Sequence, residues 1–349
     1  MILKNWEGCN VKSKKVKLVA IFLSLVILLT IGCSTQEAKN KEENSKKDWP
    51  KGVTIGSSSM GGIYYVWAGA WSKIMMEQLK IPFSVEVSAG GVDNAKLVND
   101  GKVDFGLAAD GIVYAGLNGT EWAKGTKYEN IRAIFPMYPG YFQWHTLSKI
   151  PIKSIHDMNG KRVVPGPAGS SADSYWRMIF EFFNIKPQIS NAGYADATSL
   201  MQDGMIDAIG LAPTGVPHPS TAELATTHDV RIIGVSKDDI QKLQKQYPYM
   251  SVGQIPAGTY KGMNEPVDTI VIWNVMMANK NVSEDLVYHV VKATFENHEK
   301  LVAAHPSAKD TLAENIKYIK VPLHLGAIKY YKERGITIPN EAYPPEYKK

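Results

Sequence analysis

The chain has 349 residues, of which 44% are hydrophobic and 21% charged, with 29 glycines and 19 prolines. This composition is ordinary for a soluble globular protein and excludes a disordered, collagen-like or multi-spanning membrane chain. The length is that of two domains of common size. The chain has only two cysteines, Cys9 and Cys33, which excludes a disulfide framework and a cysteine-rich zinc site.

The formal charge of +5 is concentrated at the start of the chain, because residues 1–32 hold five lysines and one glutamate. The remainder is close to neutral and predicts no polybasic surface for nucleic acid. These first residues are typical of a secretory signal: basic residues up to Lys17 precede an apolar run, 18–31. That run is shorter than the roughly 20 residues that span a bilayer, so a permanent transmembrane helix is the weaker interpretation.

The segment from Thr30 to Cys33 resembles the bacterial lipobox, in which the cysteine is lipidated and becomes the new N-terminus. We therefore predict a signal peptide over 1–32, lipidation at Cys33, a tether over 33–48, and an extracytoplasmic protein anchored to the cell membrane by lipid. Thr30 replaces the usual leucine of the motif. Plain cleavage that leaves a free thiol is the alternative.

From Trp49 onward, strand and helix patterns occur twice in the same order. The first set has strands at 53–55, 83–87 and 103–108, with a helical stripe from Tyr64 to Leu79 and a short helix through Asn94. The second set has strands at 161–164 and 206–212, with one helix through Tyr175 and another from Gly193 through Leu200.

A short motif repeats at a fixed offset of 103 residues. Residues 97–104 and 200–207 share Leu, Asp-Gly and Asp at matched positions, and the same offset aligns Gly90 with Gly193. We predict two lobes of similar α/β topology, 49–137 plus 265–349 and 138–264. Segments 131–147 and 268–277 are expected to connect them, and a single long helix is expected from Val287 to Leu301.

Each lobe opens with a strand that ends in a Gly/Ser-rich turn, at 56–62 and at 166–171, and then begins a helix. Such a turn presents free backbone N–H groups and the positive end of the helix. Two copies predict a cleft that holds a small anionic or zwitterionic molecule. The alternative is that the glycines only form tight turns.

Motifs for catalysis, nucleotides and metals are missing. The turns lack Gly-x4-Gly-Lys and Gly-x-Gly-x-x-Gly, and the chain has neither Gly-x-Ser-x-Gly nor His-Glu-x-x-His. We therefore predict no cofactor, no metal and no catalytic residue. His145, His298 and His324 are interpreted as structural, whereas Tyr64 and Tyr194, beside the glycine turns, are either core or ligand contacts.

Read together, these segments resemble the TAXI family, the TRAP-associated extracytoplasmic immunogenic solute receptors. The resemblance covers residues 50–331, and its pieces are 56–65, 90–94, 100–107, 160–163 with the following loop, 203–208, 255–260 and 322–331. It implies a two-lobed, periplasmic-binding-protein-like (type II) fold with the ligand cleft between the lobes. It also implies a non-catalytic receptor that closes on a glutamate-like amino acid or organic carboxylate and delivers it to a TRAP-type membrane transporter.

The residues expected to contact the solute are Ser57, Ser58, Ser59, Gly61, Tyr64, Gly90, Asn94, Ala109, Gly169, Ser170, Ser171, Tyr194, Pro213 and Thr214. Two departures from the family pattern, at 169–172 and at Ala108-Ala109, put a glutamate-type ligand in doubt. A substrate-binding lipoprotein of an ABC importer is the nearest alternative. An extracytoplasmic hydrolase and a sensory receptor are the others.

Overall fold

The computed structural model describes residues 48–247 and 249–348. The predicted signal peptide, Cys33 and all but the last residue of the tether lie outside the described residues. Within those two ranges, no helix combines the length and the apolar character needed to cross a bilayer.

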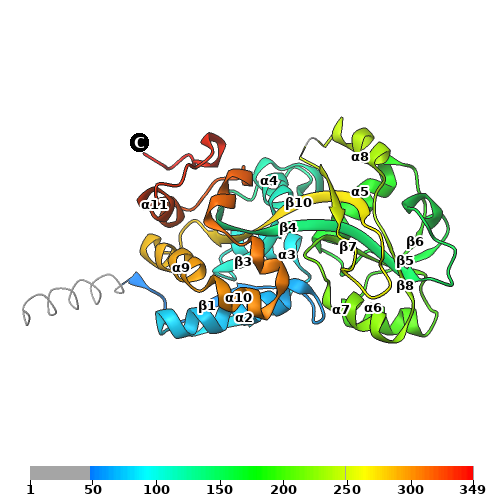
Figure 1. Cartoon of the computed structure of the whole chain (residues 1–349). Helices are drawn as coiled ribbons and strands as arrows, with labels where there is room; N and C mark the ends of the chain where they lie inside the picture. Colours follow the sequence, from blue (N-terminus) through cyan, green and yellow to red (C-terminus); the bar gives the residue numbers. More distant parts are fainter. Residues whose placement is uncertain (1–47, 248, 349) are drawn as a thin grey trace, which may run out of the picture. The chain divides into compact units, whose positions relative to one another are not determined.

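The first repeat forms a parallel unit in which β1 pairs with β2 on one side and with β3 on the other (Figure 1). Its elements are β1 (Val53–Gly56), α2 (Ile63–Leu79), β2 (Phe83–Glu86), α3 (Gly91–Asn99) and β3 (Phe105–Ala109). The second repeat has the same topology, because β5 pairs in parallel with β6 and β7. Its elements are β5 (Arg162–Val164), α5 (Ser171–Phe182), β6 (Gln188–Ile189), α6 (Tyr194–Gln202) and β7 (Ala208–Thr214).

The predicted duplication is therefore confirmed, and the predicted strand bounds agree with the structure to within two residues. Within the two repeats, only the two-residue strand β6 was not predicted; outside them, β8 (Val230–Ile233) and β9 (Ser251–Ile255) were not predicted either. The order of the sheet, β2-β1-β3-β10-β4-β7-β5-β6, places the two parallel units at opposite ends. The α/β, two-lobed fold expected from the sequence is the one observed.

The repeated Asp-Gly motif has the same structural role in both lobes. Asp104 accepts a hydrogen bond from the Thr54 backbone N–H at 2.8 Å, and Asp207 accepts one from the Arg162 backbone N–H at 2.9 Å. Each aspartate thus ties the end of a repeat to its first strand. Gly101 and Gly204 follow their helices with φ of +66° and +70°, a conformation that glycine adopts without strain.

Two long antiparallel strands, β4 (Ile131–Leu147) and β10 (Val267–Asn279), join the lobes. The second half of β10 pairs with β3 and its first half with β9 (Ser251–Ile255), whereas β4 pairs with β7 and β8 (Val230–Ile233) through its second half. The register between β4 and β10 shifts between Trp273 and Val275. Such an irregularity bends the strands locally where they cross between the lobes.

Aromatic side chains fill the core of each lobe. In the first, Trp71 of α2 contacts Phe83, Phe105 and Phe135 at centroid distances of 5.8–6.2 Å. In the second, Trp176 of α5 contacts Phe142 and Trp144 at 5.6 and 5.0 Å. The aromatic side chains of both helices are therefore part of the core, and this packing positions α2 and α5.

The other elements surround this framework (Figure 1). They are α4 (Asp110–Asn118), α7 (Pro219–Thr227), α8 (Lys237–Gln244), α9 (Glu284–Glu296), α10 (His298–Ala304), α11 (Leu325–Glu333) and the 3-10 turns at 121–123, 155–158, 306–310, 313–318 and 340–342. The prediction of a single helix from Val287 to Leu301 is wrong. Asn297 leaves the helical conformation at φ −116°, ψ 27°, and the chain there divides into α9 and α10.

Gly140, in the part of β4 that pairs with β10, tests how closely β4 packs against Pro213 of β7. A Cβ atom at this position would lie 2.5 Å from Pro213 Cβ and 2.9 Å from the Pro213 carbonyl carbon. We expect Gly140→Ala to lower the free energy of unfolding by about 1–3 kcal/mol, as overpacking does. Gly69→Ala is the matched control, since Gly69 lies inside α2 with nothing within 4 Å of the added atom. It should raise stability by about 0.5–1 kcal/mol. Urea denaturation in which Gly140→Ala is the more stable variant would contradict the close packing of Gly140 against Pro213.

Candidate functional site

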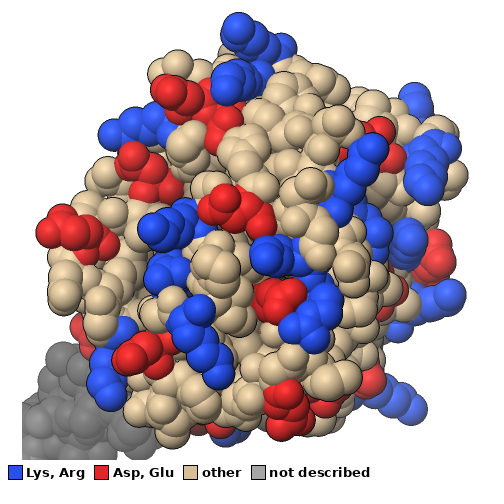
Figure 2. Space-filling model, turned by 90° about the vertical axis from the view of Figure 1, so that its right-hand side faces the viewer, with Lys and Arg blue, Asp and Glu red and all other residues tan. Residues whose placement is uncertain are grey.

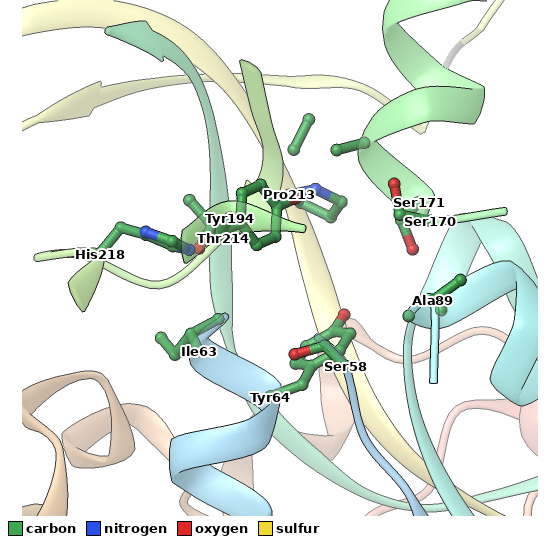
Figure 3. A pocket seen from close by; sticks show the side chains of 14 residues that line it. Ser58, Ile63, Tyr64, Ala89, Ser170, Ser171, Tyr194, Pro213, Thr214 and His218 are labelled. Carbon is green, nitrogen blue, oxygen red and sulfur yellow. The ribbon is translucent and has the colours of Figure 1, made fainter. Parts of the chain in front are cut away.

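A small cavity of about 40 Å³ lies where the two lobes meet (Figure 3). Both lobes contribute to its wall, which consists of Ser58, Ile63, Tyr64, Ala89, Gly90, Gly91, Ser170, Ser171, Ala172, Tyr194, Ala212, Pro213, Thr214 and His218. The Gly/Ser turns of the two repeats therefore line the same partly open space, at the carboxyl ends of their strands. This is the place where ligands bind in parallel α/β sheets.

Five helices begin at this cavity. Four of the wall residues are the first residues of helices: Ile63 of α2, Gly91 of α3, Ser171 of α5 and Tyr194 of α6. His218 is the N-cap of α7. The first backbone N–H groups of a helix have no partner within it, and the helix dipole places about half a positive charge there. The cavity is consequently an electropositive space although no cationic side chain lines it.

Direct hydrogen bonds join the lobes around the cavity. The Asp93 N–H of α3 donates to the Gly169 carbonyl at 3.1 Å, and Ser220 Oγ of α7 donates to the Gly61 carbonyl at 2.9 Å. Gly91 is so close to Ser171 that a Cβ atom would collide with its hydroxyl. These contacts define a closed arrangement in which each Gly/Ser turn is hydrogen-bonded to the opposite lobe.

The side chains of the wall are neutral. None of the wall residues is Asp, Glu, Lys or Arg. Burial, together with nearby His145 and His305, holds the pKa of His218 well below its usual range, so the imidazole is uncharged at neutral pH. Burial also raises the pKa of the Tyr64 and Tyr194 phenols, which remain protonated.

Two buried polar atoms of the wall have no partner within the described part of the chain. These are Ser171 Oγ and His218 Nδ1, on residues that are 4% and 1% exposed. The imidazole of His218 packs edge-on against Tyr194 at 5.1 Å. An unpaired buried polar atom costs about 1–3 kcal/mol.

Eight of the fourteen expected contact residues line the cavity: Ser58, Tyr64, Gly90, Ser170, Ser171, Tyr194, Pro213 and Thr214. The other six, Ser57, Ser59, Gly61, Asn94, Ala109 and Gly169, lie outside its wall. Gly61 and Gly169 instead provide the carbonyls that join the lobes. Ala109 is fully buried at the end of β3, and Ser59 contacts the second lobe beside Gly193.

Asn94 and Ser57 support the first Gly/Ser turn from behind. The Asn94 amide donates to the carbonyls of Ser57 and Leu107 at 2.7 and 2.8 Å and accepts from Ser88 Oγ at 2.7 Å. Ser57 Oγ donates to the Glu86 carbonyl at 2.8 Å. Both side chains are completely buried and position the turn, rather than facing the cavity.

Sequence reasoning missed His218, Ala212 and Ala89 of the cavity wall, together with three neighbours of expected residues, Ile63, Gly91 and Ala172. The proline after His218 marks the start of a helix, but nothing local indicates that this helix points at the first lobe. His145 and His324 are buried with the pKa of each lowered by burial, to about 3 and about 4. They lie outside the cavity wall, as does His298.

Within residues 48–247 and 249–348, no group of three or more His, Cys, Asp and Glu side chains is arranged to hold a metal ion. On the face shown in Figure 2, side chains of both signs are interspersed and form no field of a single sign. This face therefore lacks the positive patch that a nucleic acid backbone requires.

The comparison with known proteins agrees with this architecture. A model of the NMT1-like family matches residues 55–335, and the chain belongs to that family. The structure is similar to periplasmic binding protein BugD, with a TM-score of 0.54, 14% identity, and coverage of 83% of this chain and 100% of BugD. It is also similar to MatC from Rhodopseudomonas palustris with bound malate, with a TM-score of 0.55, 14% identity, and coverage of 82% and 98%. The chain thus has the fold of periplasmic binding proteins, and the finer TAXI assignment stays a prediction.

The two adjacent serines of the second turn should differ in their contribution to stability. Ser170 is the N-cap of α5 and accepts from the Asp173 N–H at 3.0 Å, whereas the Ser171 hydroxyl has no partner. We expect Ser170→Ala to lower the free energy of unfolding of the ligand-free protein by about 1 kcal/mol. Ser171→Ala removes an unpaired buried hydroxyl and should raise it by about 1 kcal/mol. Equal losses for the two variants in urea denaturation would show that Ser171 has a structural partner.

Proposed function

We propose that this protein is an extracytoplasmic solute receptor that captures a small carboxylate or amino-acid-like molecule between its two lobes. The observation that carries this proposal is that five helices begin at one partly open space whose wall has no charged side chains. Such a site binds anionic groups through backbone N–H donors and helix dipoles. The malate bound to MatC, a protein of similar fold, supports an organic anion as the ligand.

Capture would proceed by closure of the lobes, which we place at 49–137 plus 265–349 and at 138–264. A solute held by both turns binds the closed form better than the open form and shifts the population accordingly. Moving this equilibrium from 1:99 to 99:1 requires about 5.5 kcal/mol of differential affinity. The bulged crossing of β4 and β10 would supply the hinge, and the bonds made by Gly61 and Gly169 would hold the closed state.

Binding without catalysis fits the wall of the cavity. A nucleophilic serine needs a base within hydrogen-bond distance, but Ser171 Oγ has no hydrogen-bond partner among the described residues. His218 Nδ1 likewise has none, so these two side chains do not form a nucleophile–base pair. We therefore propose a receptor rather than a hydrolase.

The predicted lipid anchor at Cys33 would keep this receptor at the membrane, beside the carrier that accepts its solute. On the resemblance to the TAXI family, we propose a TRAP-type secondary transporter as the partner. A substrate-binding lipoprotein of an ABC importer is the alternative, since it would use the same fold and the same cleft.

Uptake by membrane vesicles from the host separates these partners. The receptor is purified from its host, and native mass spectrometry identifies the small molecule that it retains. We expect that molecule, in labelled form, to enter vesicles only when receptor and an ion gradient are both present, because a secondary transporter is driven by such a gradient. Receptor denatured by heat is the control.

Uptake that needs ATP and survives collapse of the gradient would replace the TRAP-type partner with an ABC importer. Uptake that is equally fast without receptor, or a purified protein that retains no small molecule and closes on none, would contradict the receptor function itself.

A further inference from the structure

A further hydrogen bond joins the lobes outside the cavity wall. Tyr249 Oη, in the second predicted lobe, donates to Glu121 Oε1 of the first at 3.0 Å. Neither residue belongs to the cavity wall. The bonds at Gly61 and Gly169 each use a backbone carbonyl, whereas this bond joins two side chains. It can therefore be removed by substitution without a change to the backbone or to the residues that line the cavity.

Glu121 and Tyr249 line two different surface clefts at the junction of the lobes. One cleft, of about 510 Å³, has Glu121 on the side of the first lobe and Asp173 on the side of the second. The other, of about 670 Å³, has Asp110 on the first side and Tyr249 and Ser251 on the second. The bond from Tyr249 to Glu121 thus crosses from lobe to lobe where the two clefts adjoin.

The loop that carries Glu121 is fixed to the first lobe. Trp122 Nε1 donates to the Ile112 carbonyl of α4 at 3.0 Å, and the Trp122 ring contacts Tyr128 at a centroid distance of 4.9 Å. Glu121 itself has a φ of +49°, a left-handed conformation that residues with a Cβ atom rarely adopt. Such conformations persist where the surrounding structure holds them, and they are frequent at functional contacts.

Tyr249 is supported by its own lobe and packs against the other. Its ring contacts that of Tyr247 at 6.2 Å, and Tyr247 contacts Phe182 of α5 at 6.3 Å. Gly111, in the first turn of α4, lies against these tyrosines, because a Cβ atom there would be 3.4 Å from Tyr249 Cε2 and 2.5 Å from Tyr175 Oη. Since each partner is fixed to its own lobe, a movement of one lobe away from the other would separate Tyr249 Oη from Glu121 Oε1.

We propose that Glu121 and Tyr249 form a latch that holds the closed receptor together and sets how fast it opens. This proposal rests on the proposed receptor function and adds to it two residues that control release of the solute without touching it. Opening of the lobes breaks the bond, so its loss speeds dissociation. The solute meets the open form before the latch has closed, so the association rate is unchanged.

Stopped-flow kinetics with the small molecule that the protein retains on purification, in labelled form, test the latch. We expect Tyr249→Phe and Glu121→Ala each to raise the dissociation rate about three- to tenfold, which is the effect of one net hydrogen bond. The double variant should release the molecule no faster than either single variant, because each substitution alone already breaks the bond. The association rate should be the same in all of them.

Tyr247→Phe is the matched control, since it removes a phenol hydroxyl two residues from Tyr249 that is bonded to Gln246 of the same lobe. It should leave the dissociation rate unchanged. An unchanged rate in either single variant, or effects that multiply in the double variant, would overturn the latch.

Small-angle X-ray scattering of the wild-type protein, with and without the retained molecule, separates failure of the latch from failure of the receptor function. A radius of gyration that falls when the molecule binds supports closure of the lobes, and unaltered dissociation in the variants would then overturn the latch alone. A radius of gyration that does not change would contradict closure itself, and the latch with it.

Discussion

Unpaired backbone N–H groups at the starts of helices are the constraint on which the site depends. A helix that begins inside a protein leaves its first N–H groups without partners, and burial of such groups costs free energy. Here α2, α3, α5 and α6 begin with residues of the cavity wall, and α7 has its N-cap there. Part of this demand is met by the protein itself, through the Ser170 hydroxyl and the Gly169 carbonyl. The remaining donors belong to residues beside a space whose wall has no acidic side chain.

Because residues of both lobes line the cavity, the same arrangement couples solute binding to the closure of the two lobes. The two turns belong to different lobes, so a solute that touches both stabilises only the closed arrangement. A small residue is needed where the start of α3 meets the second Gly/Ser turn, since any side chain at Gly91 would collide with Ser171. The core of each lobe is independent of this contact, because Trp71 and Trp176 anchor α2 and α5 within their own lobes.

Much of the fold was predictable because the same order of strands, turns and helices occurs twice in the chain. The Asp-Gly motifs at 100–104 and 203–207 repeat not only in sequence but in hydrogen bonding, with each aspartate capping the first strand of its lobe. The Gly/Ser turns were recognisable for the same reason. The break at Asn297 was not predictable from periodicity, because the apolar stripe continues across α9 and α10 while the backbone does not.

The site was predictable only in part, because residue type shows which groups can bind and not which way they point. Asn94 suits ligand contact by its chemistry, yet its amide is used completely in holding the first turn to β3. Ser170 and Ser171 are indistinguishable in sequence, although one caps a helix and the other is free. His218 enters the cavity through the packing of α7 against the opposite lobe, which is a long-range contact without a local signal.

The central claim, that backbone amides of both lobes hold the solute, is tested most directly by amide chemical shifts. In a 15N-labelled sample titrated with the small molecule that the protein retains on purification, the account predicts the largest shifts at the N–H groups of Gly91, Val92, Ser171 and Ala172, all at the same ligand concentration. Shifts confined to one lobe, or centred on residues away from these helix starts, would contradict it.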